Sequence, residues 1–258
     1  RSGGFNAVGG LAASELTFEE EENWTYEAGV KSWLFDRRVM LNASAFRVNW
    51  TNLQISTFSS NSVVTQAIIT NVGDMKTNGV EVQAEVKATD IVSVGGSVTY
   101  SDPKFGKGAY DPPYSTQCGN PSTVCDLVTV PGRGLQASIA GHRPARSVKL
   151  QYNLHATADI PVSADWTMSG RVDVNYTGPS YTNSLNVTNF GERTLTNLRL
   201  ALESDTYSIA AWVTNLTNED YNANVIQQPR NYSVGTQRIM EIYQGEGRRF
   251  GVTASAKF

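Results

Sequence analysis

Apolar and polar residues alternate with a period of two along much of the chain. The C-terminal run shows this most clearly, because Phe250, Val252, Ala254, Ala256 and Phe258 alternate with polar or small neighbours. Successive side chains of a β-strand point to opposite faces of its sheet, so this alternation predicts a strand with one apolar face.

The same pattern predicts nine strands. They lie at about 24–35, 38–50, 80–87, 92–100, 147–159, 166–176, 194–203, 207–216 and 249–258. The runs from Val148 to Asp159 and from Trp166 to Tyr176 alternate without a break. The predicted fold class is therefore all-β.

The connections between these strands alternate in length. Short turns are predicted at 36–37, 88–90, 161–165 and 204–206, and long polar segments at about 51–74, 102–146, 177–193 and 217–247. An antiparallel up-and-down meander produces this order when one end carries tight turns and the other carries large loops.

The composition of the two faces favours a transmembrane β-barrel. The apolar face mixes Ala and Gly with Val, Leu and aromatic rings, and the opposite face carries charged and amide side chains at regular intervals. Such strands suit lipid on one side and a wet lumen on the other. Aromatic residues near strand ends fit the interfacial girdles of such barrels: Trp24, Tyr100, Trp166, Tyr176, Tyr207 and Phe258. An ordinary solvent-facing sheet also explains the alternation, but it does not explain the alternating loop lengths.

The amino-acid composition argues against several classes of function. The 258 residues contain 17% charged residues, below the roughly 25% of soluble domains, while Ser, Thr and Asn supply about a quarter of the chain. A net charge of -3 without a basic run argues against a nucleic-acid partner. The two His residues have no metal-ligand or triad setting. We therefore expect no enzyme activity, no cofactor and no metal site.

Nine strands are an odd number, and an open sheet would leave unpaired backbone groups in hydrocarbon. The chain also begins at Arg1, without an initiator Met or the signature of a signal peptide. We expect residues 1–258 to be one portion of a larger barrel.

Five segments in order resemble motifs of TonB-dependent outer-membrane receptors. Asn23–Ser32 resembles the family's "nYExGxKs" strand, and 38–54 resembles the strand that follows it. Asn71–Glu81 is similar to an "N-G...G-x-E" segment, Val213–Tyr221 to "NLtdxxY", and Arg248–Phe258 to the terminal strand. Together they cover nearly the whole chain.

This resemblance implies a 22-stranded barrel in the bacterial outer membrane. The chain would be its C-terminal nine or so strands, and a plug domain and TonB box would lie upstream. The family's function would be to import a scarce nutrient, such as a ferric siderophore, cobalamin, haem or a glycan, with energy delivered by TonB through the plug. Other partners would be outer-membrane lipid, lipopolysaccharide and the barrel assembly machinery, which would recognise Phe258. A passive porin-like channel and a secreted carbohydrate-binding β-protein are the alternatives.

Candidate ligand contacts lie in the predicted long loops. Aromatic and Arg side chains there could grip an anionic, aromatic metal chelate by charge and cation-π contact: Tyr110, Tyr114, Arg133, Arg143, Arg230 and Tyr232. The alternatives are that these side chains bind lipopolysaccharide phosphates or pack the loops. Cys118 and Cys125 are expected to form a disulfide, since the periplasm is oxidising, with free thiols or a metal pair as the alternatives.

Charged residues on the polar strand face are predicted to point into the lumen and to pair with each other or with the plug. They are Glu27, Lys31, Glu81, Glu85, Lys87, Lys149, Arg171, Asp173, Arg199 and Glu203.

Overall fold

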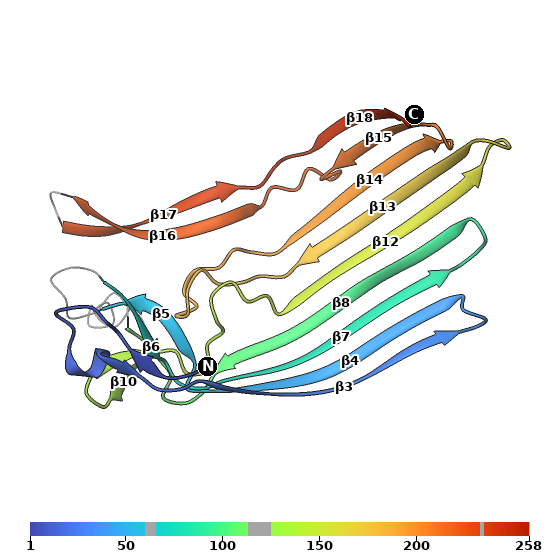
Figure 1. Ribbon diagram of the computed structural model, residues 1–258. Helices are drawn as coiled ribbons and strands as arrows, with labels where there is room; N and C mark the ends of the chain where they lie inside the picture. The colour runs from blue at the N-terminus through green and yellow to red at the C-terminus, as the bar shows by residue number, and fades with distance from the viewer. Residues whose placement is uncertain (60–65, 113–124, 233–234, 258) are drawn as a thin grey trace.

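The protein is seen in a computed structural model that describes residues 1–59, 66–112, 125–232 and 235–257. Nine long antiparallel strands form one sheet in the order β18-β15-β14-β13-β12-β8-β7-β4-β3 (Figure 1). Their bounds are β3 Glu22–Leu34, β4 Val39–Thr51, β7 Met75–Lys87, β8 Val92–Phe105, β12 Leu150–Pro161, β13 Thr167–Thr177, β14 Arg193–Glu203, β15 Tyr207–Thr214 and β18 Arg249–Ala256. The predicted fold class and the nine predicted strands are confirmed.

The observed strands extend beyond some predicted limits. Strand β7 begins at Met75 rather than near Val80, and β8 continues to Phe105 rather than ending near Tyr100. Both extensions lie at the loop end, where the outward positions are polar. Hydrophobic alternation therefore stops before the backbone pairing does.

The register brings the apolar positions of all strands onto one face. Ala45 pairs with Val80, Val80 with Tyr100, and Tyr100 with Leu150, and paired residues share a face. The same face continues to β18, where Val252 lies opposite Ala211. Many of its side chains are exposed and others are half-buried, and Val252 has a relative accessible surface of 71%. A continuous exposed apolar face of this kind fits contact with lipid.

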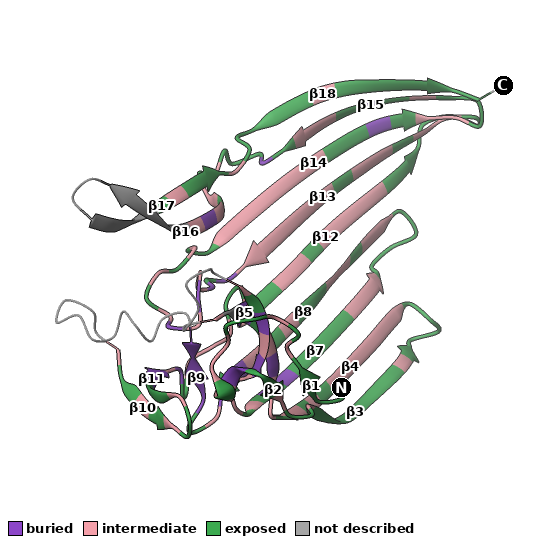
Figure 2. Cartoon of the chain, turned by 60° about the vertical axis from the view of Figure 1, so that its left-hand side comes forward, coloured by how far each residue is buried: buried purple, intermediate pink, exposed green. Residues whose placement is uncertain are grey.

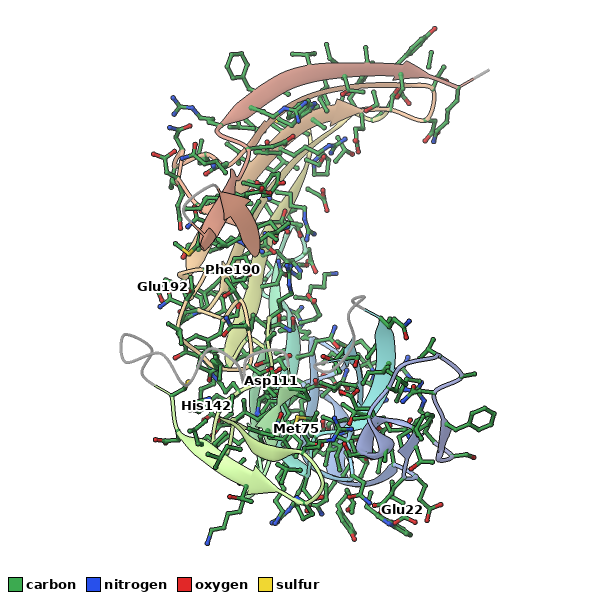
Figure 3. The ribbon with its side chains drawn as sticks, turned by 90° about the vertical axis from the view of Figure 1, so that its left-hand side faces the viewer. Glu22, Met75, Asp111, His142, Phe190 and Glu192 are labelled. Carbon is green, nitrogen blue, oxygen red and sulfur yellow. The ribbon has the colours of Figure 1, made fainter. Side chains whose placement is uncertain are left out.

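The sheet is a curved wall rather than a flat layer. Viewed from the loop end it forms an arc, with β3 and β18 at its two edges (Figure 3). No helix within the described residues is long and apolar enough to cross a membrane.

The two ends of the wall differ as the connection lengths predict (Figure 1). Short turns join β3 to β4, β7 to β8, β12 to β13 and β14 to β15, and the longer connections lie at the opposite end. The β3–β4 turn holds Phe35, Asp36 and Arg37 at φ values of 53°, 52° and 64°, which is left-handed backbone for three successive residues.

Small sheets and one short 3-10 helix lie in the N-terminal segment before β3 and in the long connections, which are predicted above only as polar segments. These elements are β1 Gly4–Phe5, η1 Ala13–Glu15, β2 Thr17–Phe18, β5 Gln54–Phe58, β6 Ala67–Asn71, β9 Tyr110–Asp111, β10 Leu127–Val130, β11 Gly134–Ser138, β16 Asn222–Tyr232 and β17 Gly235–Gln244. They pair as β1-β2, β5-β6, β10-β11-β9 and β16-β17.

Most buried residues lie at the loop end, and few lie within the wall, such as Ala201 and Ala210 (Figure 2). One cluster of buried apolar side chains consists of Val72, Phe105, Ala109, Ala137, Ile139 and Leu185. This distribution has a physical reason: strands in lipid keep their apolar side chains outward, whereas water-exposed loops must bury theirs.

Candidate functional site

The candidate site is the group of packed segments at the loop end, here named the outer loop cluster. It comprises the described residues of 1–21, 52–74, 106–149 and 178–192. The buried apolar residues come from three of these connections and from the end of β8, and Leu53, Ile55 and Met75 pack against them. The surface presented to the outside therefore has its own small core and a defined shape.

Tyr110 is part of the framework of this cluster. Its hydroxyl donates a 2.7 Å hydrogen bond to the carbonyl oxygen of Asn71, and its backbone N–H donates to the carbonyl of Val72. The side chain is buried. These contacts favour the alternative that Tyr110 packs the loops.

Arg133 occupies a buried polar position that joins three segments. One guanidinium nitrogen donates to the Ser14 carbonyl at 2.7 Å and to the Thr70 hydroxyl at 2.9 Å. The other terminal nitrogen lies 3.7 Å from the Glu15 carboxylate, and the two side chains have exposed fractions of only 8% and 1%. This buried network of hydrogen bonds joins the N-terminal segment to the loops that contain Thr70 and Arg133.

Asp111 is the clearest electrostatic feature of the cluster. Burial raises the pKa of its carboxyl group to about 6, and a hydrogen bond with Ser184 opposes this rise. Asp111 follows Tyr110 in β9, while Ser184 belongs to the connection between β13 and β14. The carboxyl group therefore links two loops and is protonated more readily than an exposed one.

The β13–β14 connection is held against the β8–β12 connection by reciprocal bonds. The backbone N–H of Arg143 donates to the Asn186 side-chain oxygen at 2.8 Å, and the Asn186 amide donates back to the Arg143 carbonyl at 2.8 Å. The Arg143 guanidinium lies 4.8 Å from the centre of the Tyr181 ring, a cation-π distance.

His142 and Arg146 add further links between these loops, and Arg146 also reaches β16 in the β15–β18 connection. His142 Nδ1 lies 3.1 Å from the Ser184 carbonyl oxygen, so Nδ1–H is the donor in this contact. Arg146 lies over the Phe190 ring and donates to the Asn224 side chain at 3.0 Å. Figure 3 shows His142 and Phe190 at the loop end facing the viewer. The sequence offered few signals for these pairings, because Asn186 and Ser184 resemble ordinary loop residues.

Several predicted site residues lie outside what the structure describes. Tyr114, Cys118 and Phe258 are not among the described residues, and the side chains of Arg230 and Tyr232 are not described. Cys125 packs against the buried cluster and is disulfide-bonded. Its pairing with Cys118 stays a prediction, and so do the ligand contacts of the other residues.

The polar face of the wall carries ion pairs between the predicted charged residues, and one contact between a His ring and a carboxylate. His155 Nε2 lies 3.2 Å from the Glu85 carboxylate, Arg171 pairs with Asp173 at 2.7 Å, and Arg199 pairs with Glu203 at 2.8 Å. Within the described residues no group of three His, Cys, Asp or Glu side chains could hold a metal ion.

Lys149 departs from its predicted position in the lumen. Its ammonium group lies 5.5 Å from the centre of the Tyr100 ring and 3.4 Å from the Asp102 carboxylate, both on the apolar face of the sheet. Lys149 precedes β12, so strand alternation no longer fixes its direction.

An arc of antiparallel strands with an exposed apolar face, a polar face and packed loops at one end defines the wall of an outer-membrane β-barrel. A sequence profile described as "TonB dependent receptor-like, beta-barrel" matches residues 2–216. The chain belongs to this family of TonB-dependent receptors, which are proteins of the bacterial outer membrane. The suspected family and the predicted location are thereby confirmed.

Solved structures share the fold at low sequence identity. The ferric yersiniabactin uptake receptor FyuA from Yersinia pestis is 17% identical, with a TM-score of 0.70, over 100% of this chain and 33% of that one. The siderophore receptor PiuA from Acinetobacter baumannii is 18% identical, with a TM-score of 0.64, over 95% of this chain and 29% of that one. BauA, the ferric preacinetobactin receptor from the same species, is 18% identical, with a TM-score of 0.61, over 96% and 32%. The chain spans about a third of the length of these structures.

Proposed function

We propose that the protein containing this chain is an outer-membrane transport receptor that imports a scarce nutrient with energy delivered through TonB. The observation that carries the proposal is the family match over residues 2–216. A ferric siderophore is the first substrate class to test, because FyuA, PiuA and BauA are named as receptors for siderophores or ferric chelates. Cobalamin, haem and glycans remain in the proposal as other classes.

The outer loop cluster is the surface that we propose meets the nutrient. Arg143 is half-buried and lies over the Tyr181 ring, which leaves a cation beside an aromatic face at the loop end. Tyr110 and Arg133 act in this proposal chiefly by fixing the loops that surround such a ligand. A rigid surface loses less conformational entropy on binding than a mobile one.

Growth of a strain lacking the whole receptor tests the function. We expect slower growth than wild type on one ferric siderophore under iron limitation, with normal growth on free iron. Restoring the receptor should restore growth, and removing TonB from that restored strain should abolish the gain.

Two outcomes would contradict the proposal. Uptake that survives without TonB would favour the passive porin-like channel. Unchanged growth across iron, haem, cobalamin and glycan sources would remove the transport assignment altogether. A matched strain with an unrelated porin deleted controls for general changes in membrane permeability.

A further inference from the structure

A group of cations lies on the lipid-facing side of the wall at its loop end. We name the group formed by Arg47, Lys76, Lys104 and Lys149, together with Asp102, the rim patch. Backbone pairing places its members side by side on three strands: Asn49 pairs with Lys76, and Lys76 with Lys104. In the row below, Arg47 pairs with Asn78, and Asn78 pairs with Asp102. These positions share the face of Val80 and Tyr100.

Aromatic side chains of the same face lie immediately beside the rim patch. Tyr26 pairs with Arg47, and Trp24 pairs with Asn49 on the adjoining strand. Tyr100 precedes Asp102 by two residues and receives the Lys149 ammonium over its ring at 5.5 Å. All three rings are exposed. Such rings mark the boundary between hydrocarbon and headgroups in membrane barrels.

The height of the patch agrees with that boundary. From Val92 to Tyr100, β8 rises roughly 20 Å along the membrane normal, at about 3.3 Å per residue and a tilt of about 40°. The apolar band of outer-membrane barrels is about 25 Å tall. Asp102 and Lys104 come next along the strand, so the rim patch lies at headgroup level.

The rim patch contains more positive than negative side chains. Asp102 contacts both Lys104, at 3.2 Å, and Lys149, at 3.4 Å, and it is the one carboxylate of the patch. Neither Arg47 nor Lys76 forms an ion pair within the part of the chain that the structure describes. Glu22 lies on the same face at the start of β3, where it pairs with Thr51, so four cations stand against two carboxylates in this part of the headgroup region.

The rest of the wall does not repeat this arrangement. At the loop end of β13 the outward Tyr176 hydroxyl donates to the Glu192 carboxylate at 2.6 Å, so an acidic group lies there. Farther along the sheet, the outward residues nearest the loop end are Val213 on β15 and Phe250 on β18. The cations of the rim patch thus lie on β4, β7 and β8 and just before β12, and they are not spread evenly around the rim.

We propose that the rim patch binds the phosphate groups of a glycolipid of the outer leaflet, namely lipopolysaccharide. Lys and Arg side chains at headgroup level can donate charge-assisted hydrogen bonds to phosphate oxygens, while the adjoining rings lie against the upper acyl chains. The site is separate from the loops proposed to meet the nutrient. It depends on the outer-membrane location and not on the transported substrate.

The experiment uses the whole receptor purified in detergent. Its affinity is measured for lipid A that carries both phosphates and for the same lipid after enzymatic dephosphorylation. We expect the wild type to prefer the phosphorylated lipid. The variant K76Q/K104Q/K149Q should bind it roughly a hundredfold more weakly, since each Lys near an anionic lipid surface contributes about fivefold.

A matched control removes three cations from the other end of the wall. The variant R37Q/R38Q/K87Q should bind the phosphorylated lipid as the wild type does. Heat-modifiable gel mobility establishes that both variants are folded. If the rim variant is not folded, the affinities of the wild-type receptor for the phosphorylated and dephosphorylated lipid still test whether phosphate groups are bound.

Three results would overturn the proposal. These are equal affinity for the phosphorylated and dephosphorylated lipid, unchanged affinity in a folded rim variant, and complete competition by millimolar inorganic phosphate. The last would show a site for a soluble anion instead of a lipid.

Discussion

Glycines on the polar face of the wall are covered by side chains from the neighbouring strand. The Phe46 ring lies over Gly79, which is directly opposite it on β7, and the Trp212 ring covers Gly251 in the same way on β18. The Glu85 carboxylate crosses over Gly95 to reach His155 on the strand beyond. A large side chain over a strand glycine shields its backbone and fixes the register.

Substituting Gly79 by Ala tests this covering at the residue scale. The added methyl group would overlap the Phe46 ring, so we expect the barrel to lose about 1–3 kcal/mol of unfolding free energy. The midpoint of urea unfolding, followed by heat-modifiable gel mobility, measures this loss.

Gly170 provides the comparison, because an added methyl group there would meet only the end of the Leu200 side chain, at 3.3 Å. Gly170→Ala should cost far less than Gly79→Ala. Equal costs for the two substitutions would show that the Phe46 ring is not the cause.

At the scale of elements, the loops at the outer end are joined by buried polar groups. Asp111 belongs to β9 and its partner Ser184 to the β13–β14 connection, while Arg133 joins η1 to β6 through Ser14 and Thr70. Each bond joins two segments that are distant in sequence. The stability of any one loop therefore depends on the others.

Asp111 gives this coupling a dependence on pH. Because burial raises its pKa to about 6, the folded cluster binds the proton more tightly than the unfolded chain does. Its contribution to stability is therefore largest below the unfolded pKa. It falls by up to about 3 kcal/mol as the pH rises to 6 and beyond.

The prediction is that hydrogen exchange of the Tyr110 and Ile139 amides, corrected for intrinsic rates, is slower at pH 5 than at pH 7.5. Asp111→Asn should flatten this difference, because an amide does not titrate. A pH dependence that is the same in this variant would assign the effect to another group.

The terminal strand β18 pairs with β15 along its whole length, from Thr214–Arg249 to Tyr207–Ala256. Phe258 follows it outside the described residues. If the assembly machinery reads this aromatic residue, Phe258→Ala should lower the surface level of the receptor severalfold. Quantitative immunoblotting of outer-membrane fractions measures the level.

Lys257→Ala is the matched control, because the bond of Lys257 to Thr206 uses only its backbone N–H. This control should reach wild-type levels. Normal assembly of the Phe258 variant would count against the proposed recognition.

At the scale of the whole molecule, one face of the wall suits lipid and the other suits water. The two edge strands of the sheet are β3 and β18. Each edge carries backbone groups that need a partner strand in a membrane. The chain aligns with only 33% of the FyuA receptor. That a closed barrel needs strands beyond these residues, as the odd strand number predicts, stays a prediction.

Much of the wall could be predicted from the sequence, because every strand that crosses lipid needs apolar side chains on its outward face. The alternation at Val80, Val82 and Val86 is visible without coordinates, since each outward side chain meets hydrocarbon. The outer loop cluster could not be predicted in this way. The sequence left open whether Tyr110 and Arg133 contact a ligand or pack the loops. Both make long-range hydrogen bonds in the folded chain, and no sequence period encodes such bonds.

The all-β class, the nine strands, the alternating connections and the family could all be predicted from the sequence. These follow from local periodicity and short motifs, which act within one strand or turn. The folded chain was needed to show which loops pack together, that Lys149 lies outside the lumen, and that Arg47, Lys76 and Lys104 form one patch. Those features depend on strand register and on contacts between residues far apart in the chain.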